Sequence, residues 1–230
     1  MMALTTEEPM RRLVRENGLS IVLLSLFLLF WAGQSVVGHR EHNSEQREHG
    51  QPEIPYAAYL RSSHFWEATA ENWESEFFQM YFYVILTAML YQKGSSESKK
   101  LGETEPVDRD PARSKRRNAP GPVRRGGVAL KLYQHSLSLA FLLFFLVSIS
   151  LHAVAGAGVY NEDQAAHGQP GHFSVLQYAG TSRFWFESLQ NWQSEFLAIA
   201  SMVILSIFLR QRGSPESKPV DSPHDQTGSE

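Results

Sequence analysis

The chain has 230 residues, of which 43% are hydrophobic and 20% are charged, and its formal net charge at pH 7 is −3. It contains no cysteine, which excludes disulfides, iron–sulfur clusters and thiolate metal sites. The apolar residues are clustered, because the segments 18–38 and 132–161 contain no Asp, Glu, Lys or Arg. Uncharged, mostly apolar runs longer than about 18 residues are typical of transmembrane helices, which argues against a soluble globular enzyme.

The sequence contains two copies of one unit. Asn43–Pro52 matches Asn161–Pro170 at an offset of 118 residues, and Asn72–Phe77 matches Asn191–Phe196 at an offset of 119. Agreement over separated blocks at nearly constant spacing indicates an internal repeat. Each copy predicts a long apolar helix, a polar loop and a second helix.

The predicted first helices cover 18–38 and 135–156, and the second cover 72–91 and 191–210. Ser62-Ser63 and Thr181-Ser182 precede the second helices and are expected to supply their N-caps. We therefore predict an all-α membrane protein with four transmembrane helices, arranged as two tandem parallel-repeat helical hairpins. The pseudo-two-fold axis should then run along the membrane normal, so that Glu76 and Glu195 meet across it.

Basic residues predict the orientation of these helices. The N-terminal arm, the central segment 93–131 and the C-terminal segment from Arg210 onward hold 17 of the 21 Lys and Arg residues. The positive-inside rule places these segments in the cytoplasm and both interhelical loops outside. The localisation expected is the inner (plasma) membrane, multi-pass, with both termini cytoplasmic.

The same patterns divide the chain into five parts. The central segment is rich in Pro, Gly and charged residues and has almost no aromatic side chains, which is typical of disorder. The predicted parts are a cytoplasmic N-terminal arm (1–17), hairpin repeat 1 (18–92), a disordered basic cytoplasmic linker (93–131), hairpin repeat 2 (132–212) and a disordered cytoplasmic tail (213–230).

Polar residues on the second helices are the first candidate site. Their helical spacing puts them on one face, which should point into the bundle because an unpaired carboxylate in lipid is costly. Two hypotheses remain open, a proton- or cation-handling site and ordinary interhelical hydrogen bonding near the interface. The candidates are Asn72, Ser75, Glu76, Gln79, Asn191, Ser194 and Glu195.

A repeated carboxylate–histidine pattern is the second candidate site. Glu45 and His49 recur as Asp163 and His167, each four residues apart and followed by Gly-Gln-Pro. This spacing suits a half-site for zinc or another divalent ion. The simpler interpretation is a helix C-terminus, with Gly at the C′ position and the imidazole near the negative end of the helix dipole. We therefore expect no metal here.

Several motifs together resemble a bacterial family of multi-pass membrane proteins that is known only as a domain of unknown function. The resemblance covers about residues 10–218 and implies a bacterial inner-membrane setting, but brings no activity, cofactor or catalytic residue. The motifs are Arg124–Tyr133, His135–Leu139, Asn161–Pro170, Phe184–Ser188, Gln190–Phe196 and Phe208–Lys218.

Three functions remain open on the sequence. No phosphate loop, nucleophile elbow or zinc-protease helix occurs, so we expect no enzyme and no cofactor. The preferred hypothesis is a non-catalytic membrane component or scaffold. The alternatives are a small ion or proton conduit that uses Glu76 and Glu195, and an outer-face metal or pH sensor that uses His49 and His167. The expected partners are the lipid bilayer, a second copy or another membrane protein, and anionic lipids at the basic linker; nucleic acid is not expected.

Overall fold

The computed structural model describes residues 7–114, 116–169 and 171–228, and these residues form helices and loops without a strand. The four long helices are α1 (Glu7–Glu48), α3 (Ser63–Met89), α6 (Ser136–Ala166) and α8 (Ser182–Phe208). Shorter helices connect them: α2 (Tyr56–Tyr59), α4 (Gly121–Arg125), α5 (Gly127–Gln134) and α7 (Val175–Ala179), with 3₁₀ turns η1 (Pro106–Asp108) and η2 (Pro111–Arg113).

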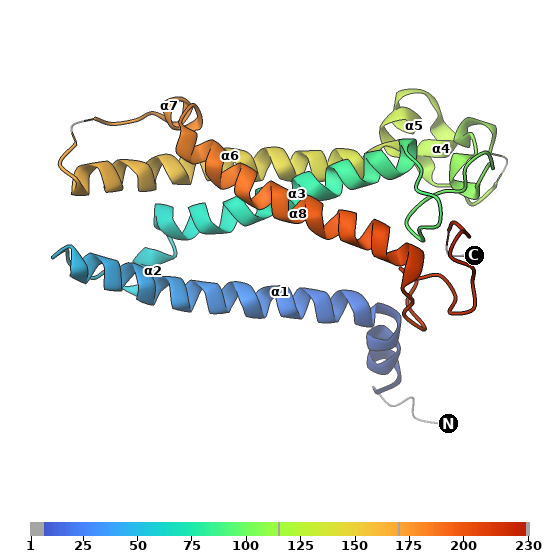
Figure 1. Cartoon of the computed structure of the whole chain (residues 1–230), viewed down its shortest axis with the longest axis horizontal. Helices are drawn as coiled ribbons and strands as arrows, with labels where there is room; N and C mark the ends of the chain where they lie inside the picture. Colours follow the sequence, from blue (N-terminus) through green and yellow to red (C-terminus); the bar gives the residue numbers. More distant parts are fainter. Residues whose placement is uncertain (1–6, 115, 170, 229–230) are drawn as a thin grey trace, which may run out of the picture.

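Helix α3 is at the centre of the fold (Figure 1). It packs along α6 over much of its length, contacts α8 less extensively and touches α1 on another side. The connections through α2 and α7 lie at one end of the molecule, called here the loop end. The start of α1, helices α4 and α5 and the C-terminal tail lie at the other, called the basic end.

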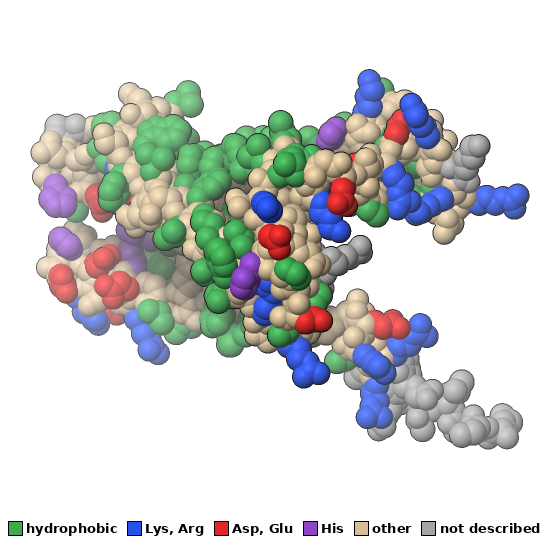
Figure 2. Space-filling model, turned by 45° about the vertical axis from the view of Figure 1, so that its right-hand side comes forward, with side chains coloured by type: hydrophobic (Ala, Val, Ile, Leu, Met, Phe, Trp, Pro, Cys, Tyr) green, Lys and Arg blue, Asp and Glu red, His purple; other side chains and the backbone are tan. Residues whose placement is uncertain are grey.

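The charge distribution of the surface follows these two ends. Figure 2 shows hydrophobic side chains over the middle of the helices and many Lys and Arg side chains at the basic end. A band of apolar surface between two polar ends is the arrangement expected of a protein that crosses a bilayer.

Among the described residues, three helices, rather than the four predicted from the sequence, are long and apolar enough to cross a membrane. They correspond to Arg11–Glu48, Ser136–Ala166 and Ser182–Phe208. Helix α3 has the same 27-residue length as α8. Its first half, however, carries four glutamates, which lower its hydropathy; they are Glu67, Glu71, Glu74 and Glu76.

The helix ends agree with the local sequence signals. Ser62 and Thr181 cap α3 and α8 by accepting bonds from the amides of Phe65 and Phe184, at 3.4 and 3.3 Å. Both β-hydroxyl side chains thereby satisfy one of the unpaired N–H groups of a first helical turn.

Equivalent loop residues in the two repeats make equivalent hydrogen bonds. The Asn43 side chain donates to the Ile54 carbonyl at 3.0 Å and accepts from the Ile54 amide at 2.9 Å. Asn161 makes the same two bonds to Phe173, at 3.0 and 2.7 Å. Each asparagine thus closes its interhelical loop onto the preceding helix.

The linker and the tail, expected to be disordered, contain defined structure where the structure describes them. The linker holds η1, η2, α4 and α5. In the tail, the buried ammonium group of Lys218 donates to four carbonyl oxygens at 2.6–3.2 Å. One of them belongs to Gly94, so the tail is attached to the turn that follows α3.

A glycine permits close packing at the loop end of α6. A Cβ atom at Gly156 would lie 2.5 Å from the buried ring of Tyr178, whereas nothing lies within 4 Å of one at Gly33. We expect Gly156→Val to lower the melting temperature in detergent by about 5 °C, because overpacking typically costs 1–3 kcal/mol. Gly33→Val, also in a helix, is the control. Equal melting temperatures for the two variants would contradict the packing described for Tyr178.

Candidate functional site

The candidate site is built around one buried histidine. His152 lies in the middle of α6, and its side chain has no exposed surface. Its Nδ1 atom is 2.7 Å from Oε2 of Glu74, and its Nε2 atom is 3.5 Å from Oε2 of Glu187. One imidazole ring therefore joins carboxylates from α3 and α8. When the ring is protonated, it can donate from both nitrogen atoms.

Glu74 is also completely buried, and both of its oxygen atoms have partners. While Oε2 faces His152, Oε1 accepts a hydrogen bond of 3.0 Å from the indole nitrogen of Trp192. A buried carboxylate without such partners would be strongly destabilising. The contact between α3 and α6 therefore depends on this pair.

Glu187 connects the histidine to the loop end. Its Oε2 atom accepts a 2.7 Å hydrogen bond from the Tyr178 hydroxyl, and its Oε1 atom accepts one of 2.9 Å from Arg183. Arg183 also forms a 2.5 Å ion pair with Asp163. Burial, and then the bond to Glu187, raise the pKa of the Tyr178 phenol, which therefore stays protonated as a donor.

Two more glutamates extend the site along α3. Glu71 accepts a 2.6 Å hydrogen bond from the side chain of Asn191, whereas the buried Oε1 of Glu67 has no hydrogen-bond partner. With Glu74, these residues are spaced i, i+4 and i+7, which places them on one helix face. We call Glu67, Glu71, Glu74, His152 and Glu187 the interior cluster.

The interior cluster lies nearer the loop end than the basic end. His152 is about 24 Å along α6 from its first residue, and α5 precedes α6 on the side of the basic end. On the basic side of the cluster, Phe78 stacks on Trp192 with ring centroids 4.2 Å apart. Phe145 and Phe196 pack against the same ring of Phe78, at 4.9 and 5.9 Å. These four rings form an aromatic layer between the cluster and the basic end.

Towards the loop end, further histidines lie close to the cluster. His64 at the start of α3 makes a 3.1 Å contact with the exposed Glu162. The His42 ring lies 4.5 Å from that of His64. Titratable groups therefore extend from the cluster to the surface at the loop end, whereas aromatic rings lie on the side of the basic end.

The polar face predicted from the sequence is only partly inside the bundle. Asn72 and Glu76 are exposed, and so is Ser194. Ser75 is buried, with its hydroxyl donating to the Asn72 carbonyl at 2.8 Å.

The other predicted residues lie between α3 and α8. Gln79 donates to the backbone carbonyl of Glu195 at 2.7 Å, and Asn191 bonds to Glu71. Glu195 is half-buried, and the negative charge of Glu76 is close enough to act on it. The two carboxylates share no hydrogen bond in the part of the chain described.

The carboxylate–histidine pattern forms helix ends. His49 and His167 contact the carbonyls of Glu45 and Asp163 through Nδ1, at 2.9 and 2.8 Å, and both rings are exposed. Gly50 and Gly168 follow with φ of +67° each, as expected of C′ glycines. Among the described residues, no group of three or more His, Asp or Glu side chains could hold a metal ion. The hypothesis of a divalent-ion site at these residues therefore gains no support.

Most of the interior cluster was not predicted from the sequence. Glu67, Glu71 and Glu74 have helical spacing but lie beside a second polar face, which drew attention to Glu76 instead. His152 was the available signal, since it is a polar residue within a 30-residue run free of acidic and basic residues.

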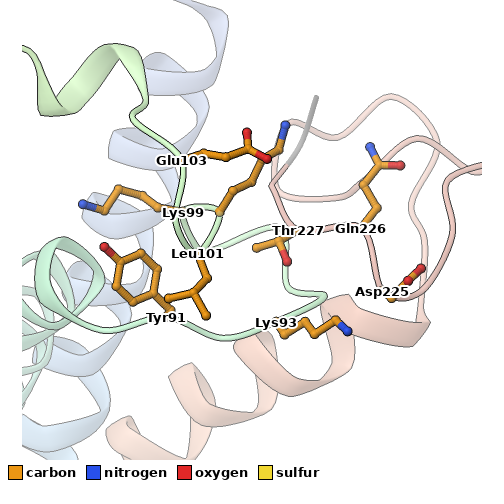
Figure 3. Close-up of a pocket in the computed structure, with 9 residues that line it drawn as sticks. Tyr91, Lys93, Lys99, Leu101, Glu103, Asp225, Gln226 and Thr227 are labelled. Carbon is orange, nitrogen blue, oxygen red and sulfur yellow. The ribbon is translucent and has the colours of Figure 1, made fainter.

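A pocket at the basic end has mixed charge. Figure 3 shows Lys93 and Lys99 on the segment after α3, with Asp225 and Thr227 of the tail on its other side. The Lys99 ammonium is already paired with Asp108 at 2.8 Å. Of the three lysines that line the pocket, Lys99 is therefore not free to bind an anionic ligand.

Comparison with known proteins gives a family but no function. No curated protein and no solved structure matches the chain. Residues 10–229 match the family described as Domain of unknown function (DUF6766). Because the match covers nearly the whole sequence, the chain belongs to this family of unknown function.

Proposed function

We propose that the chain is a four-span protein of the bacterial inner membrane with α3 as its fourth span. Helix α3 is as long as α8 and turns its most buried glutamate towards α6. Polar side chains of spanning helices face the bundle interior, so its low hydropathy is compatible with crossing the bilayer. The gathering of basic residues at one end supports cytoplasmic termini and an outer loop end.

We further propose that the protein is a non-catalytic membrane component that binds protons from the outer side at the interior cluster. The observation that carries this proposal is the position of His152 between Glu74 and Glu187. Ionisable residues inside transmembrane segments are rare and typically mark proton or ion sites.

The balance of charge supports proton binding. The cluster has four carboxyl groups, whereas among the described residues the positive charge near them comes from Arg183 and, when protonated, from His152 and His64. In a low-dielectric interior, unbalanced carboxylates favour uptake of protons. The histidines and Glu162 at the loop end offer groups through which protons can enter.

The aromatic layer favours a proton-responsive sensor over a conduit. Phe78, Phe145, Trp192 and Phe196 have no group that can carry a proton by exchange, apart from the indole N–H that Glu74 already accepts. A change in the charge of the cluster would instead alter the contacts of α3 with α6 and α8. A scaffold built on these helices would thus report outer acidity to a partner.

The indole of Trp192 provides a direct measurement of proton binding. In liposomes with the interior held at pH 7, we expect tryptophan fluorescence to change as the outer pH is lowered from about 8 to about 5, because the unbalanced carboxyl groups of the cluster take up protons as the pH falls. Glu74→Gln and His152→Gln should each abolish most of the change, because each removes one member of the charged pair that lies against the indole.

Glu76→Gln is the matched control, since Glu76 lies on the same helix but is exposed. It should retain the response. A response that survives His152→Gln, or one that disappears with Glu76→Gln alone, would contradict the proposed site.

The aromatic layer makes a second prediction. Proteoliposomes with an imposed pH gradient should lose it no faster than empty liposomes, because the layer separates the cluster from the cytoplasmic side. The measurement is the quenching of an entrapped pH-sensitive dye. Flux that Glu76→Gln/Glu195→Gln removes would instead establish the conduit.

The topology can be measured separately, since the natural chain has no cysteine. In intact cells, a membrane-impermeant maleimide should label Gln51→Cys but label Val107→Cys only after permeabilisation. Outer labelling of Val107→Cys would reverse the orientation. Opposite sides for Gln51→Cys and Val107→Cys would also require an odd number of crossings between them, which α3 supplies.

A further inference from the structure

The two repeats have similar internal packing. Phe27 and Trp73 have ring centroids 6.1 Å apart in the first repeat, and the equivalent Phe145 and Trp192 are 6.3 Å apart in the second. We therefore treat α1–α3 as module 1 and α6–α8 as module 2.

The modules meet through different faces. Module 1 uses one face of α3, and module 2 uses side chains from both α6 and α8. Glu74 receives His152 and Trp192, Glu71 receives Asn191, and Phe78 packs on Phe145 and Trp192. Such a contact is head-to-tail, and it leaves the corresponding face of the last module without a partner.

That unpartnered face is on α8 and is exposed. The α8 residues equivalent to Glu71, Glu74 and Phe78, 119 positions later, are Gln190, Gln193 and Leu197. All three are exposed, and 64% of Leu197 is accessible. Phe186, at the position of Glu67, is 68% accessible.

The complementary surface of module 1 is also available. The residue equivalent to His152, 118 positions earlier, is Gln34, and it is exposed on the apolar α1. On the same face, Phe30 and Val37 are 68% and 64% accessible. The extensive contact of α3 with α6 has no counterpart between α8 and α1 among the described residues.

We propose that module 1 of a second copy of this chain docks on α8, repeating the contact that module 2 makes on α3. Gln34 of the second copy takes the place of His152 and bonds to Gln193. Its Trp73 takes the place of Trp192, its Asn72 bonds to Gln190, and its Phe27 covers Leu197.

The chemistry of the two central pairs argues for a second copy as the occupant. Where α3 and α6 pair a carboxylate with an imidazole, α8 and α1 offer two amides, and each amide can donate and accept. Glu74 and His152 are matched in charge, and so are Gln193 and Gln34. If module 1 docked on α3, or module 2 on α8, Glu74 or His152 would instead face a neutral amide. The differing pairs therefore fix the order of the modules.

Lipid is the less favourable occupant of these faces. A side-chain amide in hydrocarbon has no partner outside its own helix, and interhelical bonds between such groups drive association in membranes. The two repeats differ at one position of this contact, where module 1 has Arg40 and module 2 has Gly158. The glycine allows Ser63 of α3 to approach α6 closely, which an arginine would prevent. The loop ends of α8 and the partner's α1 are therefore expected to lie farther apart than those of α3 and α6.

Cross-linking tests this contact against a cysteine-free background. Gln34→Cys and Gln193→Cys, on separately tagged chains expressed together, are treated in membranes with a short bifunctional thiol reagent. A product that contains both tags is expected. Leu29→Cys, on the opposite side of α1 from Gln34, replaces Gln34→Cys in the control and should give little product.

The same two substitutions placed in one chain distinguish contact between two copies from contact within one copy. If α1 and α8 instead meet within the molecule, the double variant gives an internally linked monomer. That product, or equal yields from Gln34→Cys and Leu29→Cys, would overturn the proposal.

A charge exchange provides a second test that does not depend on the reagent. Gln193→Glu should lower the association constant in detergent or bilayers about tenfold, because it buries a carboxylate that has no positive charge beside it. Adding Gln34→His recreates the pair that joins α3 to α6 and should restore association. Failure of this rescue, with both variants folded by circular dichroism, would refute the assigned contact.

Discussion

The contact between His152 and Glu74 is the constraint on which the rest of the structure depends. Both side chains are fully buried between helices that carry exposed apolar side chains on their other sides. Charged or polar groups at this depth persist only with partners. The pair therefore holds α3 against α6, and the second nitrogen of the ring, near Glu187, brings α8 to the same place. Packing of Phe78, Phe145 and Trp192 then follows from the helix positions.

The local structure was largely predictable from the sequence, but which face of α3 is buried was not. The apolar runs, the caps at Ser62 and Thr181 and the stops at Gly50 and Gly168 each depend on neighbouring residues, and the structure has them. In α3, however, glutamates occur on two faces. Which face is buried depends on His152, which lies 78 positions away in the chain. Helical spacing alone predicted that Glu76 faces the bundle interior, whereas the contact with His152 buries Glu74.

The two repeats share the contacts that build each hairpin but differ in the ionisable groups on which the proposed function depends. Both keep the loop-closing asparagine and the close approach of a glycine to a tyrosine, since these define the hairpin. Only the contact of α3 with module 2 has acquired ionisable groups, where the equivalent positions Gln34 and Gln193 are neutral. In the proposed assembly, one interface therefore binds protons and the other is uncharged.

The anchored tail has a practical consequence for altered forms of the protein. By composition, residues 213–230 resemble a removable extension. Yet the ammonium of Lys218 is enclosed by carbonyls from two segments, including that of Gly94. Shortening the chain after Arg212 would expose these carbonyls and release the turn beyond α3. A reporter domain is therefore better fused after Glu230 than in place of the tail.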